Sequence, residues 1–303
     1  MAMVGIAGAG KMGTAIGLRL LEQGHEVMVY NRTPDRAKVL LDAGATWAAT
    51  PQQLIQNTDL VISLLSNEEA MDEVYQGADG LLKGPIGGKL IVEMSTTSPP
   101  KQQAMAALVQ AQGAAYLECP VSGSVGPARE GKLMGFVGGE AADLLRAQTV
   151  LEVLCRRIEH VGPHGAGATM KLAINLPLMV YWQTFAEALS LIQPLGLDPQ
   201  RVVEMFTESS GGPNMLKVRG GMVVQALAGT PSPNVTVHLA TMRKDVRAML
   251  AHAQSNHLAL PLTEQTLKNF DQAAADGFDD LDCTQIPVWW LKEQVKKQVK
   301  PHP

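Results

Sequence analysis

The chain has few cysteines, and their spacing excludes the common zinc-binding arrangements. There are three in 303 residues, namely Cys119, Cys155 and Cys283. No two of them form a CxxC pair, and such a sparse set indicates a reducing compartment without structural zinc. His160 and His164 are four positions apart, but Gly162 and Pro163 lie between them and would break a helix. We therefore expect no metal site.

Long apolar runs and an excess of basic residues are also missing. No apolar stretch reaches the ~18 residues of a membrane span, so we expect no membrane partner. The apolar start, Met3–Ala9, lacks a basic region before it and predicts a first strand rather than a signal peptide. Lys and Arg number 25 against 29 Asp and Glu, and neither half of the chain has a basic excess. We therefore expect no nucleic-acid partner. The sparse cysteines and the lack of a membrane span and a signal peptide lead us to expect a cytoplasmic location.

The composition, 46% hydrophobic and 18% charged, is that of a core-forming globular protein of about two domains. In the first 160 residues, short β-branched or apolar runs alternate with helical patterns, which is typical of a parallel α/β sheet. We expect strands at Val4–Ala7, Val27–Tyr30, Leu60–Leu64, Leu90–Met94, Ala115–Glu118, Met134–Val137 and Ile158–Val161. Helices are expected near Met12–Gln23, Pro34–Asp42, Glu69–Tyr75, Pro100–Gln112 and Ala141–Leu154.

After Gly162 the strand patterns stop, and helices are expected near Ala168–Leu195, Pro199–Thr207, Met215–Ala228, Thr236–Ser255 and Pro261–Asp276. The predicted domains are therefore residues 1–162 and an all-α part, 163–303, that begins with a long interdomain helix. That helix is apolar on most faces, so we expect it to be buried between domains or subunits. Pro177 lies inside it and is expected to kink it or to reset its start.

A glycine-rich turn follows the first expected strand directly. Gly8-Ala9-Gly10-Lys11-Met12-Gly13 leads from Val4–Ala7 into an apolar helix. In a GxGxxG turn of this kind the first glycine allows the tight turn, the second lets a pyrophosphate approach and the third lets the helix pack. A chance glycine-rich turn is the alternative. The pattern predicts a dinucleotide site in a Rossmann-type α/β fold, a doubly wound, mostly parallel sheet followed by an all-α C-terminal domain.

The end of the second expected strand bears on the choice of dinucleotide. Asn31, Arg32 and Thr33 stand where an NAD enzyme usually has an acidic residue for the ribose 2′-hydroxyl. A carboxylate would repel a 2′-phosphate, whereas a guanidinium binds one bidentately. The residues therefore favour NADP, with NAD possible. Helix capping by Asn31 or Thr33, beside a solvated Arg32, is the alternative.

Two further segments carry candidate chemistry. The loop around Ser122, Gly123 and Ser124 can offer backbone N–H groups and hydroxyls to a carboxylate, although an ordinary turn between strands explains it equally well. Lys171 and Asn175 are four apart and share one face of an otherwise apolar helix. A lysine there is costly to bury unless it is paired or functional, and the alternative is a lysine that reaches solvent at the start of the helix.

Together these segments resemble the β-hydroxyacid dehydrogenase family, over nearly the whole chain. The resemblance rests on the motifs already given and on Leu64-Leu65-Ser66, Ser95-Thr96, Pro120–Gly123, Gly165–Asn175, Lys244-Asp245, Pro261-Leu262 and Gly277–Asp282. It implies that Lys171 is the catalytic acid/base and that Ser122, Gly123 and Asn175 hold the substrate. It also implies that Leu65, Ser66 and Thr96 touch the nicotinamide half, that Lys244 closes over the cofactor, and that the protein is a homodimer or homotetramer. Ser124 stands where many members have a second glycine, which is similar to the NADP-preferring branch.

The chain departs from the family pattern at three places. Leu176-Pro177 follows Asn175, Tyr181-Trp182 adds bulk one turn later, and both leave the substrate open. Cys119 replaces a small residue, and with no adjacent His in the sequence we interpret it as structural.

The predicted reaction is hydride transfer between NADP(H) and a short β-hydroxy acid, semialdehyde or 2-oxo acid, with a carboxylate as small-molecule substrate. Because the site residues come from both parts of the chain, we expect catalysis to need both. The alternatives are an imine reductase, against which Lys171 argues, and a non-catalytic NADP-binding module.

Overall fold

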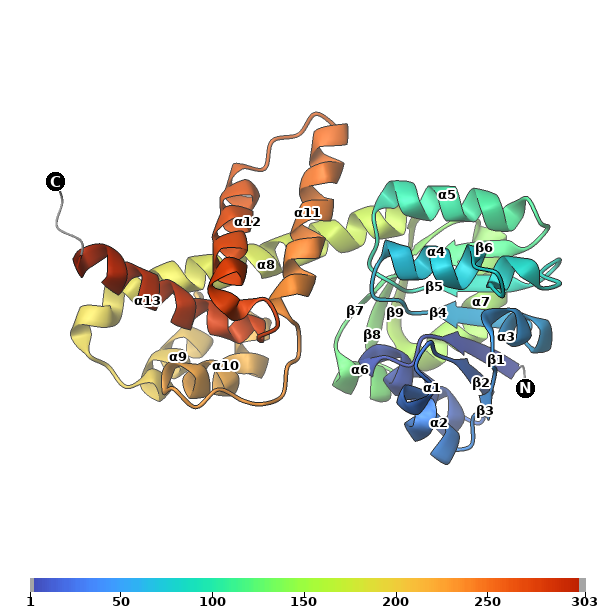
Figure 1. Ribbon diagram of the computed structural model, residues 1–303, viewed down its shortest axis with the longest axis horizontal. Coiled ribbons are helices and arrows are strands. Elements are labelled where there is room, and N and C mark those ends of the chain that lie inside the picture. Colours follow the sequence, from blue (N-terminus) through green and yellow to red (C-terminus); the bar gives the residue numbers. More distant parts are fainter. Residues whose placement is uncertain (1–2, 300–303) are drawn as a thin grey trace. The chain divides into compact units, whose positions relative to one another are not determined.

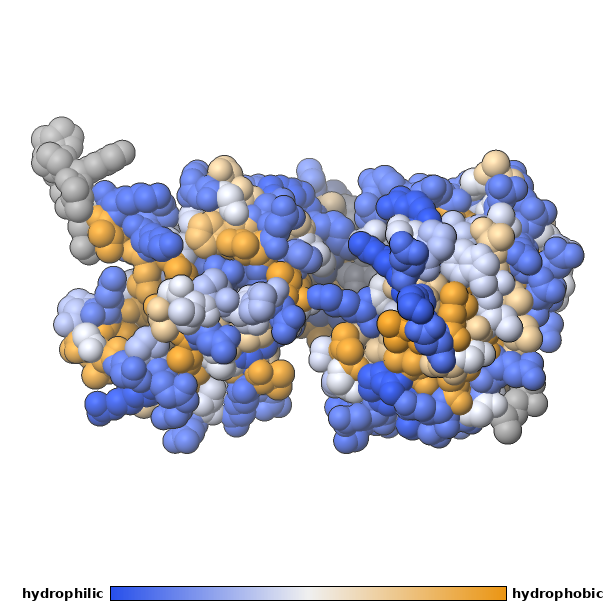
Figure 2. All heavy atoms as spheres, turned by 60° about the horizontal axis from the view of Figure 1, so that its bottom comes forward, coloured by the Kyte–Doolittle hydropathy of each residue, from blue (hydrophilic) through white to orange (hydrophobic). Residues whose placement is uncertain are grey.

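The computed structural model describes residues 3–299, and their contacts divide the chain into two compact units. The division falls after Leu172, inside helix α8 (Ala166–Ile192). Hydrophilic side chains cover most of the face of each unit seen in Figure 2, with apolar patches between them. Within residues 3–299 no helix is both long enough and apolar enough to span a bilayer.

The N-terminal unit is built on one sheet. Its strands are β1 (Met3–Ala7), β2 (Glu26–Tyr30), β3 (Thr46–Trp47), β4 (Leu60–Ser63), β5 (Leu90–Glu93), β6 (Ala115–Glu118), β7 (Val121–Ser122), β8 (Leu133–Gly138) and β9 (Cys155–Gly162). They lie in the order β3-β2-β1-β4-β5-β6-β8-β7, with β9 beside β8. The neighbours from β3 to β6 are parallel, and β8 is antiparallel to β6 and β7. This confirms the predicted mostly parallel, Rossmann-type sheet.

Helices cover both faces of this sheet (Figure 1), and the central strands β1, β4 and β5 are accordingly mostly apolar and buried. The helices are α1 (Lys11–Glu22), α2 (Lys38–Asp42), α3 (Pro51–Asn57), α4 (Glu68–Gln76), α5 (Pro99–Gln110), α6 (Val125–Arg129) and α7 (Ala141–Leu154). One core packs α1, α2 and α7 against side chains such as Val4 and Ile6. The other packs α3, α4 and α5 against Val61 and Ile91. This two-sided covering makes the sheet doubly wound.

Side-chain caps set several helix starts. The Thr50 hydroxyl accepts a hydrogen bond from the Gln53 N–H, and Asn67 caps α4 through the Ala70 N–H in the same way. Each cap satisfies a backbone donor that has no partner within the helix. Such local signals explain why α3 and α4 begin where they do.

The C-terminal unit is helical, as predicted. It contains most of α8, then α9 (Pro199–Glu208), α10 (Asn214–Leu227), α11 (Leu239–Ser255), α12 (Pro261–Ala273) and α13 (Ile286–Val299). Of the two effects expected of Pro177, the reset start is wrong, because α8 begins at Ala166 and continues past Pro177 to Ile192, and the kink stays a prediction. Pro177 is exposed, and a proline inside a helix removes a single i→i−4 hydrogen bond, which the long helix tolerates.

Candidate active site

The turn after β1 has room for glycine alone at two positions. Gly8 has φ +108°, and a Cβ atom there would lie 2.2 Å from the Leu64 carbonyl oxygen. A Cβ atom on Gly13 would lie 1.9 Å from the Gly8 carbonyl oxygen. A Cβ atom on Gly10, in contrast, would meet nothing within 4 Å. The turn is therefore closed on the protein side and open at Gly10, as a cradle for an approaching group has to be.

The first turn of α1 points its backbone donors into this cradle. Gly10 is the N-cap residue, no side chain caps the helix, and its first turn holds no acidic residue. Lys11 is exposed beside it, and Met12 is half-buried. Backbone N–H groups at a helix start and the positive end of the helix dipole favour an anion at this place. The geometry therefore fits a pyrophosphate.

Asn31, predicted to contact the cofactor, also shapes the cradle. Its Oδ1 atom accepts a hydrogen bond from the Ala9 N–H at 2.9 Å, and its Nδ2 atom donates to the Thr33 carbonyl oxygen at 2.8 Å. The side chain thus ties the end of β2 to the glycine turn. A direct contact with the cofactor stays a prediction.

Arg32 and Thr33 are exposed at the same strand end. The Arg32 Nη1 atom lies 3.3 Å from Glu73 Oε2 on α4. Partial burial raises the pKa of Tyr30, and the charge of Glu73 raises it further. Sequence reasoning missed Glu73, because nothing local connects it with Arg32, 41 residues away.

The loops after β4 and β5 are joined by a buried hydrogen-bond chain. The Leu65 N–H donates to Ser95 Oγ at 2.7 Å, and the Ser95 N–H donates to Glu93 Oε1 at 2.7 Å. The Tyr75 hydroxyl donates to the other oxygen of Glu93 at 2.8 Å. Burial raises the pKa of the Glu93 carboxyl, although these donors oppose the shift.

This hydrogen-bond chain runs beside the residues that are predicted to contact the nicotinamide half of the cofactor. Leu65 is half-buried, Ser66 follows it on the surface, and half-buried Thr96 follows Ser95. Because β1, β4 and β5 are parallel neighbours, both loops lie at the same sheet edge as the glycine turn. In open α/β sheets this edge, where the strand order reverses, is where ligands bind.

The predicted carboxylate-binding loop follows β6. Ser122 is the last residue of β7, which pairs with β8, and Gly123 has φ +132°. A Cβ atom on Gly123 would lie 2.7 Å from Leu133 Cδ2, so the chain can turn outward here only with glycine. Gly123 and Ser124 are exposed, and the Ser124 side chain does not cap α6. The loop thus presents backbone and hydroxyl groups outward.

Lys171 and Asn175 lie one turn apart on α8, the first half-buried and the second buried. The start of this helix is held by Glu118, the last residue of β6, which sequence reasoning missed. Its Oε1 atom accepts hydrogen bonds from the Gly165 and Gly167 N–H groups, both at 2.7 Å. β6 is the neighbour of β5, so the first turn of α8 is tied to the same sheet. An acidic residue inside an apolar strand was the signal available.

Lys244 lies on α11 in the C-terminal unit, with its Nζ atom 3.2 Å from Asp245 Oδ1. Asp245 is buried. In the same unit Trp182 is buried and Tyr181 stacks on Phe185, so both aromatic residues after Asn175 pack within the helices.

The thiols of Cys119 and Cys155 are buried. Burial raises the pKa of the Cys119 thiol well above its ordinary value and that of Cys155 to about 12. Both thiols are therefore protonated at neutral pH, which agrees with a structural role for Cys119. In residues 3–299 no three His, Cys, Asp or Glu side chains are grouped as metal ligands.

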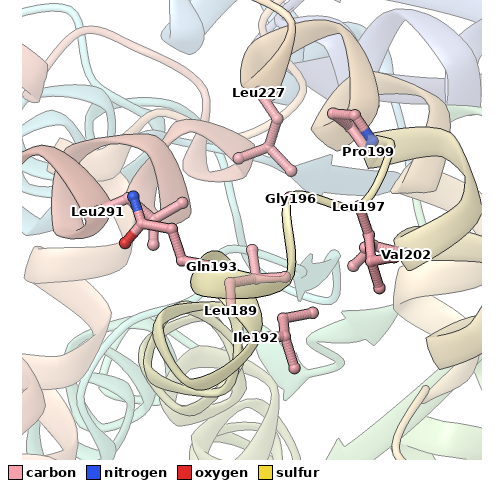
Figure 3. Close-up of a pocket in the computed structure, with 9 residues that line it drawn as sticks. All are labelled: Leu189, Ile192, Gln193, Gly196, Leu197, Pro199, Val202, Leu227 and Leu291. Atoms are coloured by element: carbon pink, nitrogen blue, oxygen red, sulfur yellow. The ribbon is translucent and has the colours of Figure 1, made fainter.

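A pocket in the C-terminal unit is apolar. Figure 3 shows aliphatic side chains from α8, α9, α10 and α13 around it, and Gln193 is the polar member of the lining. With no titratable or nucleophilic group, this lining cannot move a proton. The N-terminal unit therefore holds the better candidate for chemistry.

Comparison with known proteins gives matches over both units. A family described as the NAD binding domain of 6-phosphogluconate dehydrogenase matches residues 3–162. A second, described as NAD-binding of NADP-dependent 3-hydroxyisobutyrate dehydrogenase, matches residues 165–289.

Individual relatives are similar over nearly the full length. A 3-hydroxyisobutyrate dehydrogenase of Pseudomonas aeruginosa is 36% identical over 94% of this chain and 97% of its own. A 2-hydroxy-3-oxopropionate reductase of Escherichia coli is 32% identical over 93% of this chain and 95% of its own. The solved structure of Psf3 in complex with NADP+ and 2-OPP has a TM-score of 0.84 at 29% identity, and covers 94% of this chain and 99% of that one.

Proposed function

Because the chain belongs to the β-hydroxyacid dehydrogenase family and is an NAD(P)-dependent oxidoreductase, we propose that it interconverts a short β-hydroxy acid with its semialdehyde or oxo acid. NADP(H) is the proposed cofactor, and Lys171 is the proposed general acid/base. The observation that carries the proposal is the arrangement at one sheet edge. The Gly8–Gly13 cradle, the loops after β4 and β5, and the anchored start of α8 all lie there.

The cradle supports binding of a dinucleotide. Gly10 is open and the first turn of α1 is uncapped, so its N–H groups can bind the pyrophosphate. Arg32 would hold the 2′-phosphate, with Asn31 and Thr33 beside it. The loops around Leu65, Ser66 and Thr96 would contact the nicotinamide half, and Lys244 would contact the cofactor from α11. When bound, the nicotinamide supplies or accepts the hydride.

Lys171 would move the proton. In the reducing direction its ammonium donates a proton from Nζ to the oxygen of the forming alkoxide, and in the oxidising direction the neutral amine accepts the hydroxyl proton. Lys171 is half-buried on α8. Lys171 lies on a helix whose first turn is held by two hydrogen bonds to the sheet, so the amine is carried on a fixed element.

The remaining residues would hold the substrate. Ser122, Gly123 and Ser124 present hydroxyl and backbone groups that suit a carboxylate, and the Asn175 amide can hydrogen-bond the reacting oxygen or its neighbour. Fixing the carboxylate places the reacting carbon, which contributes much of the rate in reactions of this kind. The names of the relatives favour a three- or four-carbon acid. The oligomeric state and the cytoplasmic location stay predictions.

A substrate screen tests the proposal. NADPH oxidation is followed with glyoxylate, succinic semialdehyde, tartronate semialdehyde and methylmalonate semialdehyde, and NADP-linked oxidation with 3-hydroxyisobutyrate and serine. We expect saturable turnover with at least one of these acids, and a lower kcat/KM for the same carbonyl compound without its carboxylate. Binding of NADPH without turnover of any acid would contradict the proposed function.

A further inference from the structure

Glu118 is a fully buried carboxylate at the end of β6, and its contacts lead to α8. Oε1 accepts from the Gly165 and Gly167 N–H groups at 2.7 Å, while Oε2 is buried and has no hydrogen-bond partner. A cap within the chain of α8 itself would satisfy the same donors locally. Here the cap comes from a strand 47 residues earlier, so it also fixes where the helix starts relative to the sheet.

The backbone around Glu118 is so closely packed that two neighbouring positions have room for glycine alone. A Cβ atom on Gly138 would lie 2.0 Å from Glu118 Oε1, and one on Gly167 would lie 2.4 Å from the Phe136 carbonyl oxygen. Two strands and the helix therefore meet at glycines, with the carboxylate between them. A displacement of the first turn of α8 would break at least one of the two hydrogen bonds.

The surroundings of the carboxyl act in opposite directions, and burial is the larger effect on its pKa. Burial raises the pKa of Glu118, whereas the backbone N–H groups of the first turn and the nearby His164 favour the ionised form. Hydrogen bonds to a carboxylate are shorter and about twice as strong as neutral ones, and the helix dipole adds to them. A neutral amide of the same shape would hold the turn less firmly and would bring an NH₂ group to the place where Oε2 has no partner.

We propose that Glu118 is a positioning residue for Lys171, acting through the first turn of α8. Lys171 is four residues beyond Gly167, one helical turn or about 6 Å along the axis. The anchored turn therefore sets how far Lys171 lies from the sheet and on which side of α8 it lies. This inference rests on the proposed role of Lys171 in proton transfer. It predicts that weakening the anchor lowers the rate of the chemical step and leaves cofactor affinity unchanged.

The first test compares Glu118→Gln with Thr169→Val. The control removes a hydrogen bond of the same helical turn, from Thr169 Oγ1 to the Gly165 carbonyl oxygen, and leaves Glu118 in place. We expect Glu118→Gln to lower kcat about tenfold while the Kd for NADPH and the KM stay within about twofold, and Thr169→Val to leave all three near native. If Glu118→Gln does not fold, Glu118→Asp, which keeps the charge but is shorter, replaces it with the same expectation. A native kcat in the variant would overturn the proposal.

Combining Glu118→Gln with Lys171→Ala separates positioning from a general loss of structure. If Glu118 acts through Lys171, adding Glu118→Gln to Lys171→Ala changes the residual rate by less than about twofold. A further tenfold loss would overturn the proposal. Amide hydrogen exchange of residues 165–171 is the readout that needs no substrate. We expect faster exchange in Glu118→Gln, and unchanged exchange would contradict the anchoring even in a protein that turned over none of the acids tested.

Discussion

Arg32 and Glu73 form an ion pair at the place where we propose the 2′-phosphate binds. Their side chains are 74% and 59% exposed, so the pair adds little to stability, about 0–1 kcal/mol. It matters for binding, because a phosphate at Arg32 has to share the guanidinium with a carboxylate or displace it. Both residues therefore bear on the choice between NADPH and NADH.

Replacing Arg32 tests the phosphate contact. A charge-assisted hydrogen bond contributes about 1.5–3 kcal/mol, roughly 10- to 150-fold in affinity. We expect Arg32→Ala to weaken NADPH by that order and to leave NADH unchanged, as measured by quenching of protein fluorescence. Lys38→Ala, which removes an exposed cation paired with Asp42, is the control and should change neither. Equal weakening of both cofactors would show that Arg32 does not read the phosphate.

Replacing Glu73 tests the competition. Removing the Glu73 carboxylate frees the Arg32 guanidinium from the ion pair and removes one negative charge near the proposed phosphate site. Glu73→Gln should therefore tighten NADPH by up to about fivefold, the scale of a surface ion pair. NADH should bind as before. Glu69→Gln, an exposed change on the same helix, serves as control. If NADH tightens equally, the pair has no part in the choice of cofactor.

For individual residues, the sequence predicts those whose role depends on their chain neighbours and misses those whose role depends on a tertiary contact. Gly8 and Gly13 are predictable because a turn between a strand and a helix needs glycine at that spacing. Glu73 and Glu118 are not, because each gains its role from a segment more than 40 residues away.

Among the elements, Asp282 joins the segments that lead into α11 and α13. One of its oxygens accepts from the Thr236 N–H, the Thr236 hydroxyl and the Val237 N–H, and the other from the Thr284 N–H and hydroxyl. Burial opposes ionisation, but these donors outweigh it and lower the pKa of Asp282. Asp282 thus holds the segment that leads into α11, on which Lys244 lies.

The pH dependence of stability tests this clamp. Because the folded pKa is depressed, the contribution is complete above the unfolded pKa of about 3.9 and is lost as the pH falls through the folded value. Asp282→Asn should lower the free energy of unfolding by about 1–3 kcal/mol at pH 7. The difference in the free energy of unfolding between the variant and the wild type should become smaller as the pH falls. Urea unfolding at several pH values measures it. Asp280→Asn, an exposed neighbour, should show no such gap. A gap that stays constant with pH would contradict an ionised clamp.

Long elements with a clear period were predictable, and short ones were not. The helix near Ala141–Leu154 has the predicted bounds, whereas the two-residue strands β3 and β7 and the five-residue α6 escaped prediction. Elements this short have no measurable period and form through their neighbours. α13 was also missed.

For the whole molecule, strands alternate with helices along the first part of the chain, and this alternation is typical of a parallel sheet covered by helices. This is why the sequence supported the architecture of the N-terminal unit. The antiparallel β8 depends on the loop at Ser122–Gly123, whose geometry no periodicity predicts.

Cofactor binding should stabilise the whole protein by mass action. At about 100 times its Kd a ligand contributes about 2.7 kcal/mol to the free energy of unfolding. We expect NADPH to raise Tm more than NADH does at equal concentration, as measured by scanning calorimetry. Equal shifts would contradict the proposed preference for NADPH.

The most direct test of the central claim is the kcat of Lys171→Arg with NADPH and the best substrate of the screen. Arginine keeps the positive charge but cannot release its proton at accessible pH. If Lys171 moves the proton, kcat falls about 10²- to 10⁴-fold while the Kd for NADPH stays near native. A native kcat, with KM alone altered, would show that Lys171 anchors the substrate and that another group moves the proton.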